Sequence, residues 1–372
     1  MSDMHKCSSI PIQFGHDKSL HLVQQTAKLG FLDRLKSGFK RNGVIHVRQV
    51  AAGEQAVFEV LSDSKKDPTV ESTESGNVQK VTITTSEYTN MEGILKWPVG
   101  SQLDRLDINT EEFGIVFGSN LSNATTTSDK AAGVVDFQQS RETVIATASG
   151  NVSGVIPMDA LLDISSASGN VFATLMQRQG AATKQSKLRI KTTSGNIKIN
   201  EGVDAKSAMA RVHLPSYACN VSIGSVSGAI KALLGTTQSA AFESVSGPIQ
   251  LHVLPAGDGG QPDNGVSKLT TTTVSGSHSI VIADQTPAQA TGNDVKIHKF
   301  CAHNSTSGRI GITYPSWWEG KIDARSVSSS INIRGDNVQI EKRPGHVQAT
   351  KGTGGQSTEV KSTSGAIEVS FA

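Results

Sequence analysis

The chain has 372 residues, enough for one large domain or two ordinary ones, and only 18% of them are charged and 5% aromatic. With 36 glycines and few aromatic residues, the composition favours many short strands and tight corners over helix bundles. A formal net charge of +2 with scattered basic residues excludes nucleic acid as an expected partner, and three cysteines far apart in sequence are no disulfide framework. No signal peptide and no apolar run of membrane-spanning length is seen, so we expect a cytoplasmic protein without a transmembrane segment.

The first 41 residues are predicted to form a disordered tail and a short amphipathic helix. From Ser19 to Phe39, apolar residues recur at helical spacing and make one stripe, and basic residues occupy the other faces. Such a helix either caps the open end of the domain that follows or lies on a membrane surface. We favour the cap.

Residues 42–372 are predicted to form one all-β domain, with a candidate sub-boundary in the polar stretch 122–130. Near its start, residues 43–50, 56–61 and 78–85 alternate between apolar and polar side chains. Alternation with a period of two predicts strands with one buried face.

A short repeat organises the rest of the chain. Its anchor is a Ser-Gly dipeptide, and its glycines are Gly150, Gly169, Gly195, Gly228, Gly247, Gly276, Gly308 and Gly365, with Ser329 standing where a ninth would be. Three residues before the glycine position, all nine copies have a Ser or a Thr. Most copies also have apolar residues five positions before and two after it, as at Ile190 and Ile197. The pattern predicts a strand, a corner and a second strand.

The corner residues have expected physical roles. Glycine is expected to adopt a backbone conformation that is closed to residues with a Cβ. The earlier hydroxyl is expected to bond to backbone groups of the bend. Stacked corners predict a parallel β-solenoid of about nine coils, with neighbouring coils about 4.8 Å apart. Two copies depart from the apolar pattern, with Thr271 and His278 in one and His303 in the other.

The charged and metal-ligating residues favour no catalytic or metal site, and no cofactor is expected. His298, Cys301 and His303 are close in sequence, but on a strand His298 points away from the other two. Asp163 and Asp323 share one offset from their corners, but coils lie between them. Solvent-exposed charge is therefore favoured over a carbohydrate-cleaving carboxylate pair.

Tyr314, Trp317 and Trp318 concentrate much of the chain's scarce aromatic area in one turn. If exposed, they would bind a protein or a glycan, and they are therefore the candidate binding residues. If buried, they would plug the solenoid, which is the interpretation that we favour.

Two phrases are similar to a known family: Thr-Thr-Ser-Gly-Asn-Ile-Lys-Ile at 192–199 and Ser-Thr-Ser-Gly-Ala-Ile-Glu-Val at 362–369. Together with the proline-led strand before several corners, they resemble the adhesin-like β-helix family of bacterial and fungal proteins. The resemblance covers residues 42–372 and implies a β-solenoid fold. It implies no catalytic residues.

From these observations we expect a non-enzymatic scaffold or binding module. Its partner would dock along the ladder face or at the turn from Tyr314 to Trp318. The first alternative is a carbohydrate-active enzyme, a lyase or a hydrolase, on a parallel β-helix. The second is a structural solenoid that polymerises end to end.

Overall fold

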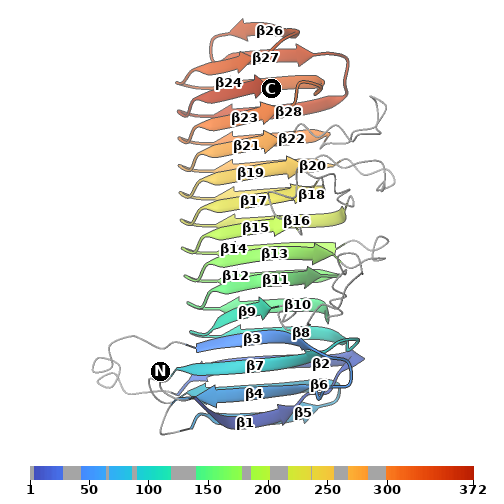
Figure 1. Cartoon of the computed structure of the whole chain (residues 1–372). Coiled ribbons are helices and arrows are strands. Elements are labelled where there is room, and N and C mark those ends of the chain that lie inside the picture. The colour runs from blue at the N-terminus through green and yellow to red at the C-terminus, as the bar shows by residue number, and fades with distance from the viewer. Residues whose placement is uncertain are drawn as a thin grey trace, which may run out of the picture. The chain divides into compact units, whose positions relative to one another are not determined.

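The computed structural model describes residues 4–27, 43–63, 67–85, 90–118, 140–177, 186–201, 217–235, 237–254, 267–283 and 299–372. Every regular element in these ranges is a β-strand (Figure 1). The chain divides into two compact units, Met1–Ala181 and Ala182–Ala372. In each unit the strands form two sheets, here called A and B, in which most neighbouring strands are parallel.

The N-terminal unit contains strands β1 to β13. Their bounds are β1 His5–Pro11, β2 Gly15–Thr26, β3 Gly43–Val50, β4 Val57–Ser62, β5 Thr69–Ser75, β6 Val78–Thr85, β7 Met91–Pro98, β8 Leu103–Thr110, β9 Gly114–Gly118, β10 Ser140–Thr147, β11 Val152–Met158, β12 Leu161–Ser166 and β13 Val171–Gln177. Sheet A has the order β1-β4-β7-β3-β9-β11-β13, and sheet B has the order β5-β6-β2-β8-β10-β12. A strand of sheet B, a corner and the next strand of sheet A make one rung, as β10 and β11 do.

The C-terminal unit contains strands β14 to β29. Their bounds are β14 Ser186–Thr192, β15 Ile197–Glu201, β16 Tyr217–Ser225, β17 Ile230–Gly235, β18 Thr237–Ser244, β19 Ile249–Leu254, β20 Lys268–Thr273, β21 His278–Ile282, β22 Phe300–Ser305, β23 Ile310–Tyr314, β24 Gly320–Ser326, β25 Ile331–Arg334, β26 Val338–Arg343, β27 His346–Lys351, β28 Gln356–Ser362 and β29 Ile367–Phe371. Sheet A has the order β15-β17-β19-β21-β23-β29-β25, and sheet B has the order β14-β16-β18-β20-β22-β28-β24-β27-β26.

The rungs of the C-terminal unit do not all stack in sequence order. The last rung of the chain, β28 with β29, lies between the β22–β23 rung and the β24–β25 rung. An antiparallel hairpin, β26 with β27, then covers β24. The spacing of corners along the sequence therefore does not reveal which rungs are neighbours.

The core consists of equivalent repeat positions placed side by side. In sheet B, Ile190 pairs with Ile223, and in sheet A, Ile197 pairs with Ile230, all of them buried. The prediction of an all-β fold of parallel rungs is confirmed. The count of about nine coils is not supported, because the structure also contains rungs that have no Ser-Gly corner. One of them is formed by β8 and β9, which are joined through residues 111–113.

The predicted N-terminal helix is wrong where the structure describes it. Residues 15–26 form β2, which lies between β6 and β8 and is parallel to both. Leu20, Leu22 and Gln24 are buried, so the segment also carries a period-two pattern. Partners on both sides satisfy the backbone of an extended strand, and this pairing overrides the helical spacing. The rest of the predicted helix, residues 28–39, lies outside the described residues.

The expected disordered tail is also corrected, because residues 5–11 form β1, antiparallel to β4. The predicted boundary between two domains at residue 42 stays a prediction. The candidate sub-boundary at 122–130 lies outside the described residues.

Candidate functional site

Seven of the eight Ser-Gly corners are closed by their own hydroxyl group. At five corners the side-chain oxygen three residues earlier accepts the glycine N–H at 2.8–2.9 Å: Gly150, Gly169, Gly228, Gly308 and Gly365. At two others the hydroxyl donates instead to the glycine carbonyl, Thr192 to Gly195 at 2.7 Å and Thr273 to Gly276 at 2.6 Å. A buried hydroxyl needs such a partner, which accounts for Ser or Thr at these seven corners. Ser244, three residues before Gly247, is the exception, because its buried hydroxyl has no hydrogen-bond partner among the described residues.

The corner glycines are required for space rather than for backbone angle. None of the eight has a φ in the left-handed region, so the expected special conformation is wrong. A Cβ built on Gly228 would lie 1.9 Å from the carbonyl oxygen of Gly195, and one on Gly308 would lie 1.9 Å from that of Gly276. At Gly228 and Gly308 the corner therefore lies directly against its neighbour within the C-terminal unit, with no room for a side chain.

In most copies, the serine before the glycine position joins neighbouring corners. Both its N–H and its hydroxyl bond to one carbonyl oxygen of the preceding rung; for Ser246 and Val226 the distances are 2.9 and 3.3 Å. The same double contact recurs at Ser168, Ser227, Ser275, Ser307, Ser328 and Ser364. The three residues of the motif thus close the corner, connect it to its neighbour and allow the close approach.

The residue two positions before the glycine leaves its side chain in solvent. In the stacking order of the C-terminal unit, these residues are Thr193, Val226, Val245, Val274, Thr306, Thr363 and Val327, and we call them the corner column. All are exposed and all are β-branched; the three consecutive valines are 47, 47 and 50% exposed. Since neighbouring rungs are about 4.8 Å apart, the column presents evenly spaced methyl groups.

The predicted binding residues lie mostly inside the protein. Tyr314 and Trp318 are 0 and 1% exposed, and Trp317 is partly exposed. The rings of Tyr314, Trp318 and Phe371 pack together, with centroids 4.6 to 5.9 Å apart. The Tyr314 hydroxyl lies 2.6 Å from Thr358 Oγ1. This burial, which raises the pKa of Tyr314, favours the plug. A binding role for the three aromatic residues stays a prediction.

The two copies that break the apolar pattern meet inside the C-terminal unit. Thr271 Oγ1 lies 2.8 Å from His278 Nδ1 and 2.9 Å from His303 Nδ1, and Thr273 Oγ1 lies 2.8 Å from His278 Nε2. Both histidines are buried, and burial lowers the pKa of His278 to about 4. The sequence departures thus form one polar cluster with a neutral His278 at neutral pH.

Of the three residues weighed as metal ligands, Cys301 and His303 both point into the core, as expected for alternate residues of a strand. Burial raises the pKa of the Cys301 thiol to about 12, so it is protonated at neutral pH. His298 lies outside the described residues.

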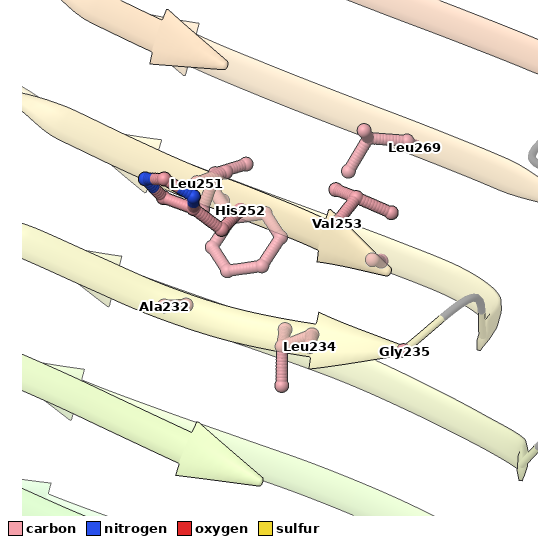
Figure 2. A pocket seen from close by; sticks show the side chains of 9 residues that line it. Ala232, Leu234, Gly235, Leu251, His252, Val253 and Leu269 are labelled. Atoms are coloured by element: carbon pink, nitrogen blue, oxygen red, sulfur yellow. The ribbon is translucent and has the colours of Figure 1, made fainter. Parts of the chain in front are cut away.

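A small cavity lies between the sheets of the C-terminal unit. Figure 2 shows it among Ala232, Leu234, Leu251 and Leu269, and its volume is about 10 Å³. That volume holds about one water molecule, and the lining is mostly apolar. The cavity therefore suits no ligand.

Filling this cavity should stabilise the protein. Ala232 pairs with Ile199 on one side and Leu251 on the other, so it is the small residue in a row of larger ones. Ala232→Val should raise the free energy of unfolding by about 0.5–1 kcal/mol in urea denaturation, since it adds apolar contacts without opening space elsewhere. The control Ala324→Val, at a buried position that does not line the cavity, should lower it by about 1 kcal/mol or more. Destabilisation by both variants would contradict the claim that Ala232 lines a cavity that a larger side chain can fill.

The described strands define a class: an all-β protein of parallel rungs in two sheets, of the β-solenoid kind. The family model described as Toastrack DUF4097 matches residues 62–370, and the chain belongs to this family. The family resemblance seen in the sequence is thereby confirmed.

Two solved structures are similar over nearly the whole chain. One is a candidate cell adhesion protein from Clostridium sporogenes, with 8% identity, a TM-score of 0.18 and 100% of both chains covered. The other is a candidate adhesin from Parabacteroides distasonis, with 10% identity, a TM-score of 0.31, and 99% of this chain and 97% of that chain covered. At such TM-scores neither likeness supports an argument about function. No curated protein matches the chain. Within the described residues, no helix is long and apolar enough to cross a membrane.

Proposed function

We propose that this protein is a non-enzymatic binding module that presents its corner column to a protein partner. The observation that carries the proposal is the row of exposed β-branched side chains on corners that are hydrogen-bonded from rung to rung. An array that is already ordered loses little conformational freedom on binding.

The chemistry of the column favours a protein over a glycan. Its members are valine and threonine, which offer methyl groups, whereas glycan sites use aromatic rings and paired polar groups. Contiguous exposed apolar groups are a feature of protein interaction sites. We also propose that the protein is cytoplasmic, as expected from its sequence.

The alternative of a carbohydrate-active enzyme gains little from Asp323, one of its two candidate carboxylates. Arg325, Gln348 and His346 bond to Asp323 and lower its pKa to about 2. A general acid must be protonated at working pH, so Asp323 is unsuited to that role. The hydrogen bonds of Asp323 with His346 and Gln348 instead connect β24 to β27 on the surface.

The alternative of an end-to-end polymer is disfavoured by the hairpin on β24. Strand β26 forms the edge of sheet B in the C-terminal unit, and its Glu341, Lys342 and Arg343 are exposed. Charged edge strands oppose the addition of a further strand.

Charging the column tests the proposal. The triple variant Val226→Lys, Val245→Lys and Val274→Lys should keep the melting temperature within a few degrees, because these side chains are exposed. Partners captured by the unmodified protein and identified by mass spectrometry would be purified, and their affinities measured by biolayer interferometry. We expect the triple variant to bind at least about tenfold more weakly.

A matched control carries the same three charges on the outer faces of the sheets: Ser222→Lys, Gln250→Lys and Thr272→Lys, all at exposed positions. It should bind as the unmodified protein does. Equal affinity of the column variant and the unmodified protein would exclude the column as the binding surface.

A further inference from the structure

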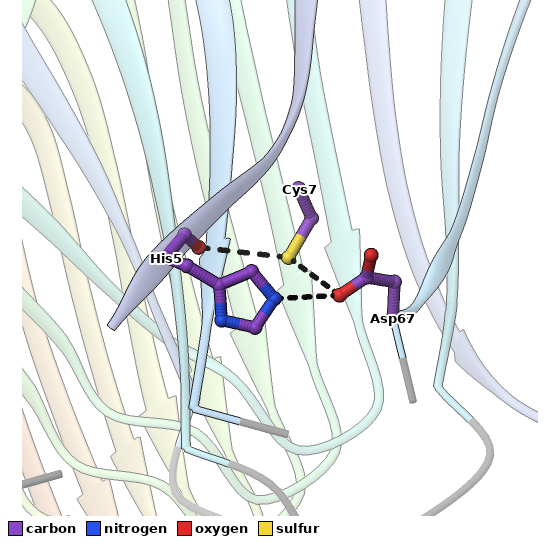
Figure 3. Close-up of side chains that lie close together, drawn as sticks. All are labelled: His5, Cys7 and Asp67. Atoms are coloured by element: carbon purple, nitrogen blue, oxygen red, sulfur yellow. Dashed lines mark hydrogen bonds and ion pairs between the residues drawn. The ribbon is translucent and has the colours of Figure 1, made fainter. Parts of the chain in front are cut away.

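Three metal-ligating side chains meet in the N-terminal unit. His5 and Cys7 are two residues apart on β1, so they lie on the same side of the strand. Asp67 lies two residues before β5 begins. Figure 3 shows the three side chains pointing toward one another, and their ligand atoms all lie within 4.8 Å of one another.

One carboxylate oxygen holds this cluster together. Asp67 Oδ1 lies 2.8 Å from His5 Nε2 and 3.3 Å from Cys7 Sγ. Both groups act as donors to it, and the Cys7 thiol also lies 3.6 Å from the carbonyl oxygen of His5. Two polar hydrogens thus occupy the space that a cation would take.

We propose that His5, Cys7 and Asp67 bind a zinc ion as its three protein ligands, with water in the remaining position. Imidazole nitrogen, thiolate sulfur and carboxylate oxygen are the ligands that zinc takes. In a tetrahedral zinc site with ordinary bond lengths the ligand atoms are roughly 3.3–3.8 Å apart. The 2.8 and 3.3 Å separations need to open by less than about 1 Å to reach that range.

The exposure of the cluster allows this movement and the entry of the ion. The side chains of His5 and Asp67 are 52 and 57% exposed. On binding, zinc replaces both hydrogen bonds. The Cys7 thiol releases its proton to solvent, and the His5 ring exchanges its Nε2 proton with solvent for one on Nδ1, so that Nε2 is free to bind the ion. Burial and the Asp67 carboxylate raise the pKa of Cys7 to about 11 in the ion-free protein, and the charge of the ion offsets this effect.

A zinc ion at this position would link the edges of the two sheets of the N-terminal unit. Strand β1 is the edge of sheet A and β5 is the edge of sheet B in the N-terminal unit. An ion held by β1 and by the residue two positions before β5 would join the two edges. Such a link stabilises strands that have a partner on one side only, and it does so by the binding free energy of the ion.

The test titrates zinc ion alone into the purified full-length chain in competition with a chromophoric chelator, and repeats the titration with cobalt. The unmodified chain should bind one zinc, and its cobalt form should show the charge-transfer absorption of a thiolate ligand. Cys7→Ser should weaken zinc binding by at least about 100-fold and abolish that absorption, and Asp67→Asn should weaken binding by about 10-fold or more.

The matched control is His16→Gln, which removes an exposed histidine outside the cluster and should bind as the unmodified chain does. The buried Cys219 and Cys301 remain in every variant and report any binding that is not due to Cys7. Absence of stoichiometric binding by the unmodified chain, or an unchanged cobalt spectrum in Cys7→Ser, would overturn the proposal.

Discussion

Gly308→Ala should lower the free energy of unfolding by about 3 kcal/mol or more, although it adds only one methyl group. The new Cβ would lie 1.9 Å from the carbonyl oxygen of Gly276 and 2.5 Å from its carbon. Both are backbone atoms of a neighbouring corner, and they cannot rotate away as the end of a side chain could. Relief therefore requires the two rungs to separate, at the expense of their hydrogen bonds. Urea denaturation followed by circular dichroism measures the loss.

Gly311→Ala is the control for that experiment. Gly311 is only three residues away on β23, but the nearest atom to its Cβ would be the carbonyl oxygen of His278 at 3.6 Å, an ordinary contact. Since its φ is not positive, alanine fits the strand, and the change in unfolding free energy should stay within about 0.5 kcal/mol. Similar losses in both variants would mean that close stacking is not the reason for the glycine.

Acid should destabilise the protein through His278 by about 3 kcal/mol between pH 7 and pH 4. Burial lowers the pKa of His278 from 6.5 to about 4 in the folded chain. The unfolded chain therefore takes up the proton first as the pH falls. The stabilisation due to neutral His278 is complete above pH 6.5 and is lost progressively as the pH falls toward 4. Unfolding free energies measured in urea at several pH values give this curve.

Replacement of His278 by valine isolates its contribution. The residues paired with it on the neighbouring rungs are Ile249 and Ile310, so an aliphatic side chain suits the position. His278→Val should remove about 3 kcal/mol of the acid-dependent loss. The assignment to His278 would be contradicted if the variant lost as much stability between pH 7 and pH 4 as the unmodified protein.

The repeated part of the fold could be predicted because its information is local. Apolar residues at fixed offsets define two strands and the corner between them. The same offsets also set the register, as the pairing of Ile190 with Ile223 shows. The hydroxyl three residues before the glycine was predictable for the same reason, since it bonds within its own corner.

Features that depend on contacts between distant segments could not be predicted in this way. The apolar residues from Leu20 onward fit a helix and a strand alike, and pairing with β6 and β8 decides for the strand. Nothing in the corner spacing shows that β28 and β29 lie inside the stack. The space requirement at Gly228 comes from the backbone of Gly195 on another rung.

The candidate zinc site and the aromatic cluster also depend on contacts between distant segments. His5 and Cys7 are separated from Asp67 by about 60 residues, so the sequence carries no spacing signal for this cluster. From the sequence alone, Tyr314 and Trp318 could be either exposed binding residues or a buried plug. Phe371, 57 residues after Tyr314, packs against both rings and helps bury them.

The central claim is that the Ser-Gly corners stack directly and are hydrogen-bonded from rung to rung. Amide hydrogen exchange at Ser227, Ser246 and Ser275 tests it most directly, because their side chains are exposed while their N–H groups bond to carbonyl oxygens of the preceding rung at 2.9 Å. We predict exchange as slow as that of the central strands on either side. Exchange at the rate of unprotected surface amides would contradict the stacked corners.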